Sequence, residues 1–160
     1  LTDNILWHHF CHFVDLACWL YEGHEMSRVQ GYLGQPHAKT GVPMEAVVLL
    51  ETDADQSAVV HGSYHAAFRL YDKVLVTDRE TYNYNILSHE LTTSAGVAAM
   101  EDEQTNCARV IDDFIDAVRS GRQPRASGPS VLPAMRVLQA VQDDWDQRHG
   151  ARTLPGREIS

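Results

Sequence analysis

Positive charge is scarce in this sequence. Its 160 residues contain 13 Lys and Arg against 22 Asp and Glu, which leaves a formal net charge of −9. A protein of that sign repels phosphate backbones and anionic membrane surfaces. We therefore expect neither nucleic acid nor a membrane among its partners.

Cysteine is also scarce, and long apolar runs are missing. The three cysteines, Cys11, Cys18 and Cys107, show no Cys-x-x-Cys spacing, and the first two lie too far apart along one helix for a disulfide. There is no stretch of about 20 apolar residues and no secretory signal, so we expect a cytoplasmic protein. Because the chain begins at Leu1 and enters an apolar segment at once, we also expect it to be part of something longer.

What the sequence does contain is ordinary globular composition. Hydrophobic residues make up 44% of the chain and charged residues 22%, which is enough apolar material for one core. The pattern predicts one domain over residues 1–149. It predicts a flexible tail over 150–160, where no periodicity remains.

Helices are predicted at both ends of that domain. Residues 5–21 contain no Pro or Gly and are apolar on most sides, with Asp3 as the N-cap and Gly23 as the stop signal. Apolar residues at helical spacing predict two further helices, at 103–119 and 131–147.

Strands are predicted between these helices. The β-rich runs lie at 28–32, 46–52, 58–65, 73–77 and 81–87, with a turn at 53–56. Because no helices separate the strands, an antiparallel or mixed sheet is favoured over βαβ repeats. The expected fold class is α+β, with an open, mainly antiparallel or mixed β-sheet packed with helices.

The first predicted helix carries a polar stripe. His8, His12, Asp15 and Trp19 fall at i, i+4, i+7 and i+11, so they share one face of an otherwise apolar helix. Burying unpaired polar groups costs about 1–3 kcal/mol each, so the stripe needs mutual pairing in the core or a solvent-filled pocket. His9 lies beside the stripe, and we favour the pocket. Pairing of His12 with Asp15 in the core is the alternative.

Three chemistries could use this stripe. His8 and His12 could place two imidazoles on one metal ion with Asp15 as a third ligand, but the Glu of the metalloprotease signature is missing, and we assign no metal. Cys11 lies on a different helical face from His12, which disfavours nucleophilic catalysis. Proton transfer fits best, because a histidine oriented by a carboxylate can accept a hydroxyl proton while another group takes a hydride. A metal-dependent hydrolase remains an alternative, which predicts bound zinc.

The residues around the stripe resemble a known family. The segment His12-Phe-Val-Asp15-Leu-Ala-Cys-Trp19-Leu-Tyr-Glu-Gly23 resembles the H-x-x-D-L-x-x-W-L-x-G segment of the glucose-fructose oxidoreductase and inositol dehydrogenase family. Ala117-Val-Arg-Ser-Gly-Arg-Gln-Pro124 is similar to that family's A-I-R-x-G-R-x-P connection, and Thr77-Asp-Arg-Glu-Thr81 occupies the place of its G-T-x-G strand entry. The resemblance covers most of the chain.

This resemblance implies a two-domain enzyme that uses NAD or NADP. A Rossmann domain would bind the dinucleotide, and this chain would be the C-terminal domain that forms the substrate pocket and the oligomer interface. The 160 residues contain neither a Gly-x-Gly-x-x-Gly motif nor the family's Glu-Lys-Pro segment. We therefore expect the chain alone to bind no dinucleotide tightly and to be inactive. Self-association as a dimer or tetramer is expected through the face of the sheet.

Catalytic roles follow from the same resemblance. His12 matches the family histidine that handles the substrate hydroxyl proton, and Asp15 matches the aspartate that would orient it. Many sugar-oxidising members have Asp where this chain has His8 and Gly where it has Phe10. Those departures argue against a typical polyol pocket, and His8 would assist His12 in catalysis.

The substrate implied by the resemblance is a small carboxylated molecule. The segment from Thr2 to Leu16 is most similar to family members that oxidise a carboxylated hydroxymuconate semialdehyde. This similarity implies a cyclic hemiacetal, oxidised to a pyrone dicarboxylate in a site shaped by Trp7, His8 and His9. A sugar or polyol dehydrogenase of the same family is one alternative. A non-catalytic domain whose sheet pairs between subunits is another.

A carboxylated substrate needs positive groups, because carboxylates are costly to desolvate. Arg69 and Lys73, which follow the predicted strand end at 63–65, are the candidates for binding its charge. His65 could face the pocket or solvent.

Overall fold

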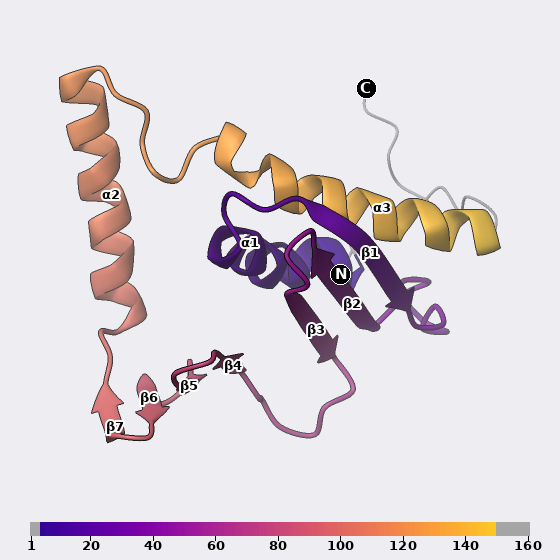
Figure 1. Cartoon of the computed structure of the whole chain (residues 1–160). Coiled ribbons are helices and arrows are strands. Elements are labelled where there is room, and N and C mark those ends of the chain that lie inside the picture. The colour runs from indigo at the N-terminus through magenta and orange to yellow at the C-terminus, as the bar shows by residue number, and fades with distance from the viewer. Residues whose placement is uncertain (1–3, 150–160) are drawn as a thin grey trace. The chain divides into compact units, whose positions relative to one another are not determined.

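The computed structural model describes residues 4–149, which fold into two compact units. The first unit takes the chain up to His65 and resumes at Gly128, and Ala66–Ser127 form the second. Figure 1 shows the elements of each. Within the described residues, no helix is both long enough and apolar enough to cross a membrane.

The first unit is a three-stranded antiparallel sheet with helices on one face. Its strands are β1 (Met26–Leu33), β2 (Glu45–Thr52) and β3 (Ser57–Ser63), in the order β1-β2-β3. Its helical segments are the π-helical turn η1 (Leu6–Phe10), which leads into α1 (Cys11–Leu20), and the 3₁₀ turn η2 (Pro129–Val131), which leads into α3 (Leu132–His149). Helix α3 packs against both α1 and β1 (Figure 1).

The core of this unit lies between the sheet and the helices. Every second residue from Ala46 to Thr52 on the central strand β2 is buried, because successive side chains of a strand point to opposite faces. Val48 is paired with Gly31 on one side and Val60 on the other, so these three share the covered face. The helical segments complete the core with Ile5, Leu6, Phe10, Val14, Ala17, Ala134, Val137, Leu138, Val141 and Trp145.

A glycine on each outer strand lets the helical segments come close to the sheet. Gly31 on β1 lies under α3, and Gly62 on β3 lies under η1. A Cβ on Gly62 would lie 2.9 Å from Cε2 of Phe10, closer than packed carbon atoms approach. The absence of a side chain at Gly62 therefore fixes how near the π-helical turn lies to β3.

The opposite face of the three-stranded sheet is uncovered and mixes apolar side chains with polar and charged ones, among them Arg28, Glu51 and His61. Tyr32 of β1 is 49% exposed and Val59 of β3 is 67% exposed, while Val47 and Leu49 of β2 between them are half-buried. Side chains of this kind on an uncovered sheet face are typical of an interaction surface.

The second unit consists of a four-stranded antiparallel sheet and one helix. The strands β4 (Asp72–Val76), β5 (Thr81–Asn85), β6 (Glu90–Thr93) and β7 (Gly96–Ala99) pair in chain order, and α2 (Glu103–Ser120) follows them. The Asp102 carboxylate caps α2 by accepting a hydrogen bond from the backbone N–H of Thr105 at 2.8 Å. Gly121 ends the helix with a φ of 70°, a left-handed conformation that favours glycine.

The α+β class and the antiparallel pairing expected from the sequence are confirmed. The prediction of one helix over 5–21 holds except that the helix opens with a π-helical turn. The strands are divided between two sheets, and β6 and β7 are additional to those predicted. The expected N-cap Asp3 and the tail 150–160 lie outside the described residues.

Candidate functional site

Side-chain hydrogen bonds connect the start of the π-helical turn η1 to α3. The side-chain amide of Asn4, which is only 7% exposed, donates to Oε1 of Gln142 at 2.9 Å. The indole N–H of Trp7 donates to the same oxygen at 3.1 Å, and the amide of Gln142 donates to Asp146 at 2.9 Å. Trp7 is thus held against α3 and packs on the core.

The π-helical turn carries two adjacent histidines, His8 and His9. A π-helical turn is wider than an α-helical one, occurs mostly as a single turn within an α-helix, and is frequent at functional sites. The ring centroids of His8 and His9 lie 4.4 Å apart, and those of His9 and Tyr64 lie 5.5 Å apart. Nδ1 of His8 shares a hydrogen bond with the hydroxyl of Tyr64. We call His8, His9 and Tyr64 the ring cluster.

Tyr64 is a site residue that sequence reasoning missed. It directly follows β3, and its backbone N–H donates to the carbonyl of Met44 at 2.8 Å, so its position is fixed by the sheet. In the sequence, Tyr64 is one residue in an alternating strand pattern, and nothing in that pattern indicates a histidine partner 56 residues away. Gln142 was missed for the same reason.

His12 and Asp15 lie on α1, one turn apart. The imidazole of His12 is exposed and Asp15 is half-buried, while Val14 and Ala17 on the inner side of the helix are buried. Within the described residues, no hydrogen bond joins His12 to Asp15. The structure thus places both on the outer face of α1, but it does not pair them directly.

The Asp15 carboxylate affects the pKa of the Cys18 thiol, which lies one turn further along α1. Burial raises the pKa of the Cys18 thiol, and the nearby Asp15 carboxylate raises it further. Both effects disfavour the thiolate, which is the reactive form of cysteine. A role for Cys18 as a nucleophile is therefore disfavoured.

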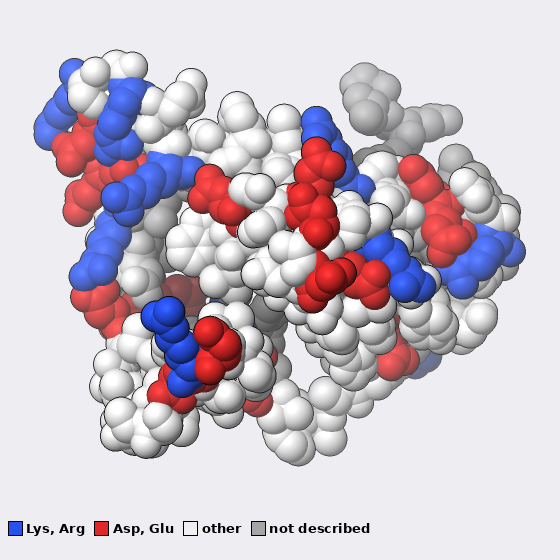
Figure 2. All heavy atoms as spheres, viewed as in Figure 1, with Lys and Arg blue, Asp and Glu red and all other residues white. Residues whose placement is uncertain are grey.

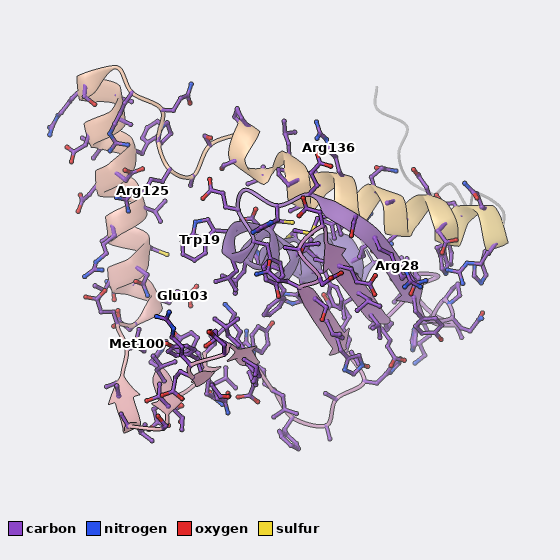
Figure 3. All side chains as sticks on the ribbon, viewed as in Figure 1. Trp19, Arg28, Met100, Glu103, Arg125 and Arg136 are labelled. Atoms are coloured by element: carbon purple, nitrogen blue, oxygen red, sulfur yellow. The ribbon has the colours of Figure 1, made fainter. Side chains whose placement is uncertain are left out.

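Trp19 completes the predicted polar stripe and is 66% exposed. Figure 3 shows its side chain projecting from the end of α1, away from the three-stranded sheet. His8, His12 and Trp19 are thus all exposed, as a pocket lining or an interface would require and a buried polar network would not.

His65 is exposed and lies near a different histidine. Its ring centroid is 6.3 Å from that of His37, in the loop between β1 and β2, and its backbone N–H donates to Oγ of Ser63 at 3.1 Å. Among the described residues, no hydrogen bond or ring contact joins the His65 side chain to the ring cluster.

Arg69 and Lys73 belong to the second unit. The guanidinium carbon of Arg69 lies 4.8 Å from the ring centroid of Tyr71, and Nζ of Lys73 lies 5.9 Å from that of Tyr84. Burial lowers the pKa of the Lys73 ammonium. These two cations thus lie near aromatic rings of their own unit, as cations often do.

The candidate site of the first unit is poor in cationic side chains and metal-ligand clusters. Residues 4–27 and 40–68 contain no Lys or Arg. In the described part of the chain, no three His, Cys, Asp or Glu side chains come together as a metal site. Figure 2 shows acidic and basic side chains interspersed on the face that it draws, without a broad basic patch.

An open groove of about 610 Å³ lies elsewhere on the first unit. It runs along the outer strand β1 and is lined by Val29, Gln30, Gly31, Tyr32, Val47, Leu49, Ala140, Val141, Asp144 and Arg148. None of the candidate residues from the sequence lines it.

The chain is similar to known oxidoreductases. A family model for the C-terminal part of bacterial oxidoreductases matches residues 1–89. The 4-carboxy-2-hydroxymuconate-6-semialdehyde dehydrogenase of Sphingobium sp. is 26% identical over 144 residues, which cover 86% of this chain and 44% of that protein.

Solved structures support the same fold. An oxidoreductase domain protein from Kribbella flavida has a TM-score of 0.75 at 16% identity, covering 91% of this chain and 50% of its own. UDP-N-acetylglucosamine 3-dehydrogenase from Acidithiobacillus ferrooxidans has a TM-score of 0.74 at 16% identity, covering 88% and 46%. An oxidoreductase from Agrobacterium radiobacter, solved with NAD+, L-tartaric acid and magnesium, has a TM-score of 0.71 at 14% identity, covering 95% and 49%. The chain thus spans half or less of the length of each of these relatives.

Proposed function

The chain belongs to the family of bacterial oxidoreductase C-terminal domains, and on that premise we propose that it is the substrate-binding and oligomerisation domain of an NAD(P)-dependent dehydrogenase. The observation that carries this proposal is the exposed imidazole of His12 on a helix whose inner side is buried in the core. A neutral imidazole can accept a proton from a hydroxyl group. The rigid helix holds that group in one place.

The dinucleotide is assigned to no residue of this chain. The 160 residues contain no Gly-x-Gly-x-x-Gly motif, which is the usual phosphate-binding turn for NAD and NADP. A bound nicotinamide would supply the hydride acceptor for the oxidation. The residues of this chain act on the substrate alone.

In the proposed reaction, His12 accepts the proton of the substrate hydroxyl group. Asp15, one turn along α1, stabilises the resulting imidazolium by its charge, because side chains three apart on a helix are neighbours. His8 and His9 line the substrate side of the π-helical turn, and Trp7 positions that turn through Gln142. Arg69, Lys73 and His65 remain candidates for binding the carboxylates.

We favour the cyclic hemiacetal of 4-carboxy-2-hydroxymuconate semialdehyde as substrate, with a pyrone dicarboxylate as product. The support is the similarity to the Sphingobium enzyme and a site whose histidines can donate hydrogen bonds to carboxylates. A sugar or polyol substrate is the alternative within the same family. A cytoplasmic location fits the free thiols of Cys11, Cys18 and Cys107.

The proposal is tested by following NAD(P)H formation by the full-length gene product with the semialdehyde, inositol and glucose. Selective turnover of the semialdehyde is expected, and His12→Ala should lower kcat by about 10²–10⁴, the range of general-base effects. His24→Ala is the matched control, because His24 is an exposed histidine of the same unit that pairs with Asp53 instead. An unchanged kcat in His12→Ala contradicts the proposed role.

A purely structural function in self-association is the second candidate. It is favoured by two exposed apolar side chains on the uncovered face of the sheet, Val59 at 67% exposed and Tyr32 at 49% exposed. Val59→Asp should convert a dimer or tetramer to a monomer in light scattering. An assembly domain without catalysis would tolerate the loss of His8 and His12, which distinguishes it from the dehydrogenase.

A further inference from the structure

The hydrogen bond between His8 and Tyr64 has a direction that follows from the chemistry of its two groups. It joins Nδ1 of the imidazole to the phenol hydroxyl. A phenol is a good donor and its oxygen a weak acceptor, whereas the unprotonated nitrogen of a neutral imidazole is basic. The Tyr64 hydroxyl therefore donates to Nδ1 of neutral His8.

This direction determines which tautomer His8 adopts. A neutral imidazole carries one proton, and the hydrogen bond made by one ring nitrogen decides the state of the other. With Nδ1 accepting from Tyr64, the proton of His8 lies on Nε2. The backbone N–H of Tyr64 donates to the Met44 carbonyl, and the ring centroid of His9 lies 4.4 Å from that of His8. These two contacts stabilise the positions of Tyr64 and His8.

A histidine with its proton on Nε2 is a hydrogen-bond donor through that atom. His8 is exposed, and neither its own segment, 4–27, nor that of Tyr64, 40–68, contains a Lys or Arg to meet an anionic group. An anion bound at these segments therefore accepts hydrogen bonds from N–H and O–H donors such as those of histidine and tyrosine.

We infer that Tyr64 is a positioning residue which fixes His8 as a donor to an anionic oxygen of the substrate, leaving His12 as the sole proton acceptor. The substrate class, a carboxylate, rests on the proposed function. His8 and His12 thus have different roles: His8 binds charge and His12 accepts the proton. Tyr64 acts through His8 and needs no contact with the substrate.

The tautomer can be measured directly on the 160-residue chain. With ¹⁵N-labelled histidine, at a pH about two units above the ordinary histidine pKa of about 6.5, long-range ¹H–¹⁵N spectra distinguish protonated from unprotonated ring nitrogens. His8 should show a protonated Nε2 and an unprotonated Nδ1, and Tyr64→Phe should give a mixture of tautomers. Tyr21→Phe is the matched control, because the Tyr21 hydroxyl donates to the carbonyl of Ser57 and to no histidine.

Kinetics of the full-length gene product test the consequence for the substrate. Tyr64→Phe should raise KM for the carboxylated semialdehyde about 3–10-fold with kcat changed less than about twofold, as expected for a weakened hydrogen bond. His8→Leu should raise KM about 10–100-fold. His8→Gln should restore most of the affinity, because the Gln amide nitrogen can occupy the place of Nε2. A loss of kcat without a change in KM in Tyr64→Phe contradicts the inference.

The outcomes separate this inference from the proposed function. A His8 protonated on Nδ1, or a tautomer unchanged in Tyr64→Phe, overturns the role of Tyr64 whatever the enzyme oxidises. If the full-length protein turns over none of the substrates, the proposed function fails, and 2-pyrone-4,6-dicarboxylate titrated into the labelled chain decides the anion role. A shift of the His8 Nε2–H signal supports that role, and its absence overturns it.

Discussion

Gly31 of β1 and Val141 of α3 are in direct contact, and the space between the strand and the helix has no room for a side chain at position 31. A Cβ on Gly31 would lie 2.3 Å from Cγ1 and 2.5 Å from Cγ2 of Val141. Both atoms belong to a buried, branched side chain that has little freedom to move. The packing of α3 on β1 therefore depends on a glycine at position 31.

Gly31→Ala should lower the free energy of unfolding by about 1–3 kcal/mol, the cost of overpacking a core. Urea denaturation followed by circular dichroism measures it. Gly128→Ala is the matched control, because no atom lies within 4 Å of a Cβ at Gly128. Adding Val141→Ala to Gly31→Ala should recover part of the loss, since the pair is in contact. Equal stability of Gly31→Ala and the wild type would contradict this packing.

Gln142 holds the π-helical turn to α3, and its loss should destabilise the site. Gln142→Leu removes the acceptor of Asn4 and Trp7, and an unsatisfied buried donor costs about 1–3 kcal/mol. Thermal unfolding measures the loss. Gln139→Leu is the control, because Gln139 makes an exposed hydrogen bond to Asp143 on the same helix. If both variants melt alike, the network does not stabilise the turn.

Asp15→Asn should lower the pKa of the Cys18 thiol. The ionised carboxylate disfavours the thiolate, so a neutral amide removes that repulsion, while burial, the larger cause, continues to hold the pKa above the ordinary value. Alkylation of Cys18 by iodoacetamide, in a Cys11→Ala and Cys107→Ala background, should become faster at each pH below the thiol pKa. Glu22→Gln, a second acidic residue near the end of α1, should leave the rate unchanged.

The sequence predicts the helices and the strands of the first unit well, because their signals are local. A continuous apolar run over 46–50 identifies β2, and the missing Pro and Gly over 5–21 identify the first helix. Strands β6 and β7 escape prediction because each has only four residues. The π-helical turn also has no local signal in the residues that form it.

Only part of the candidate site can be predicted from the sequence. The spacing of His8, His12 and Asp15 places them on one helix, and the structure confirms that helix. Tyr64 and Gln142 are joined to the site by the fold, across 56 residues from His8 and 135 from Trp7. Partners brought together by tertiary packing cannot be read from periodicity in either segment.

The first unit is interrupted by the second, and this arrangement has a consequence for synthesis. Its sheet is complete by Ser63, but the helix that covers β1 and supplies Val141 and Trp145 to the core is translated after the whole second unit. At about 5–20 residues per second, the ribosome needs roughly 4–17 s to pass from position 65 to 149. During that interval the nascent sheet exposes apolar surface that can aggregate or bind chaperones. Helix α3 covers this surface once it has been synthesised.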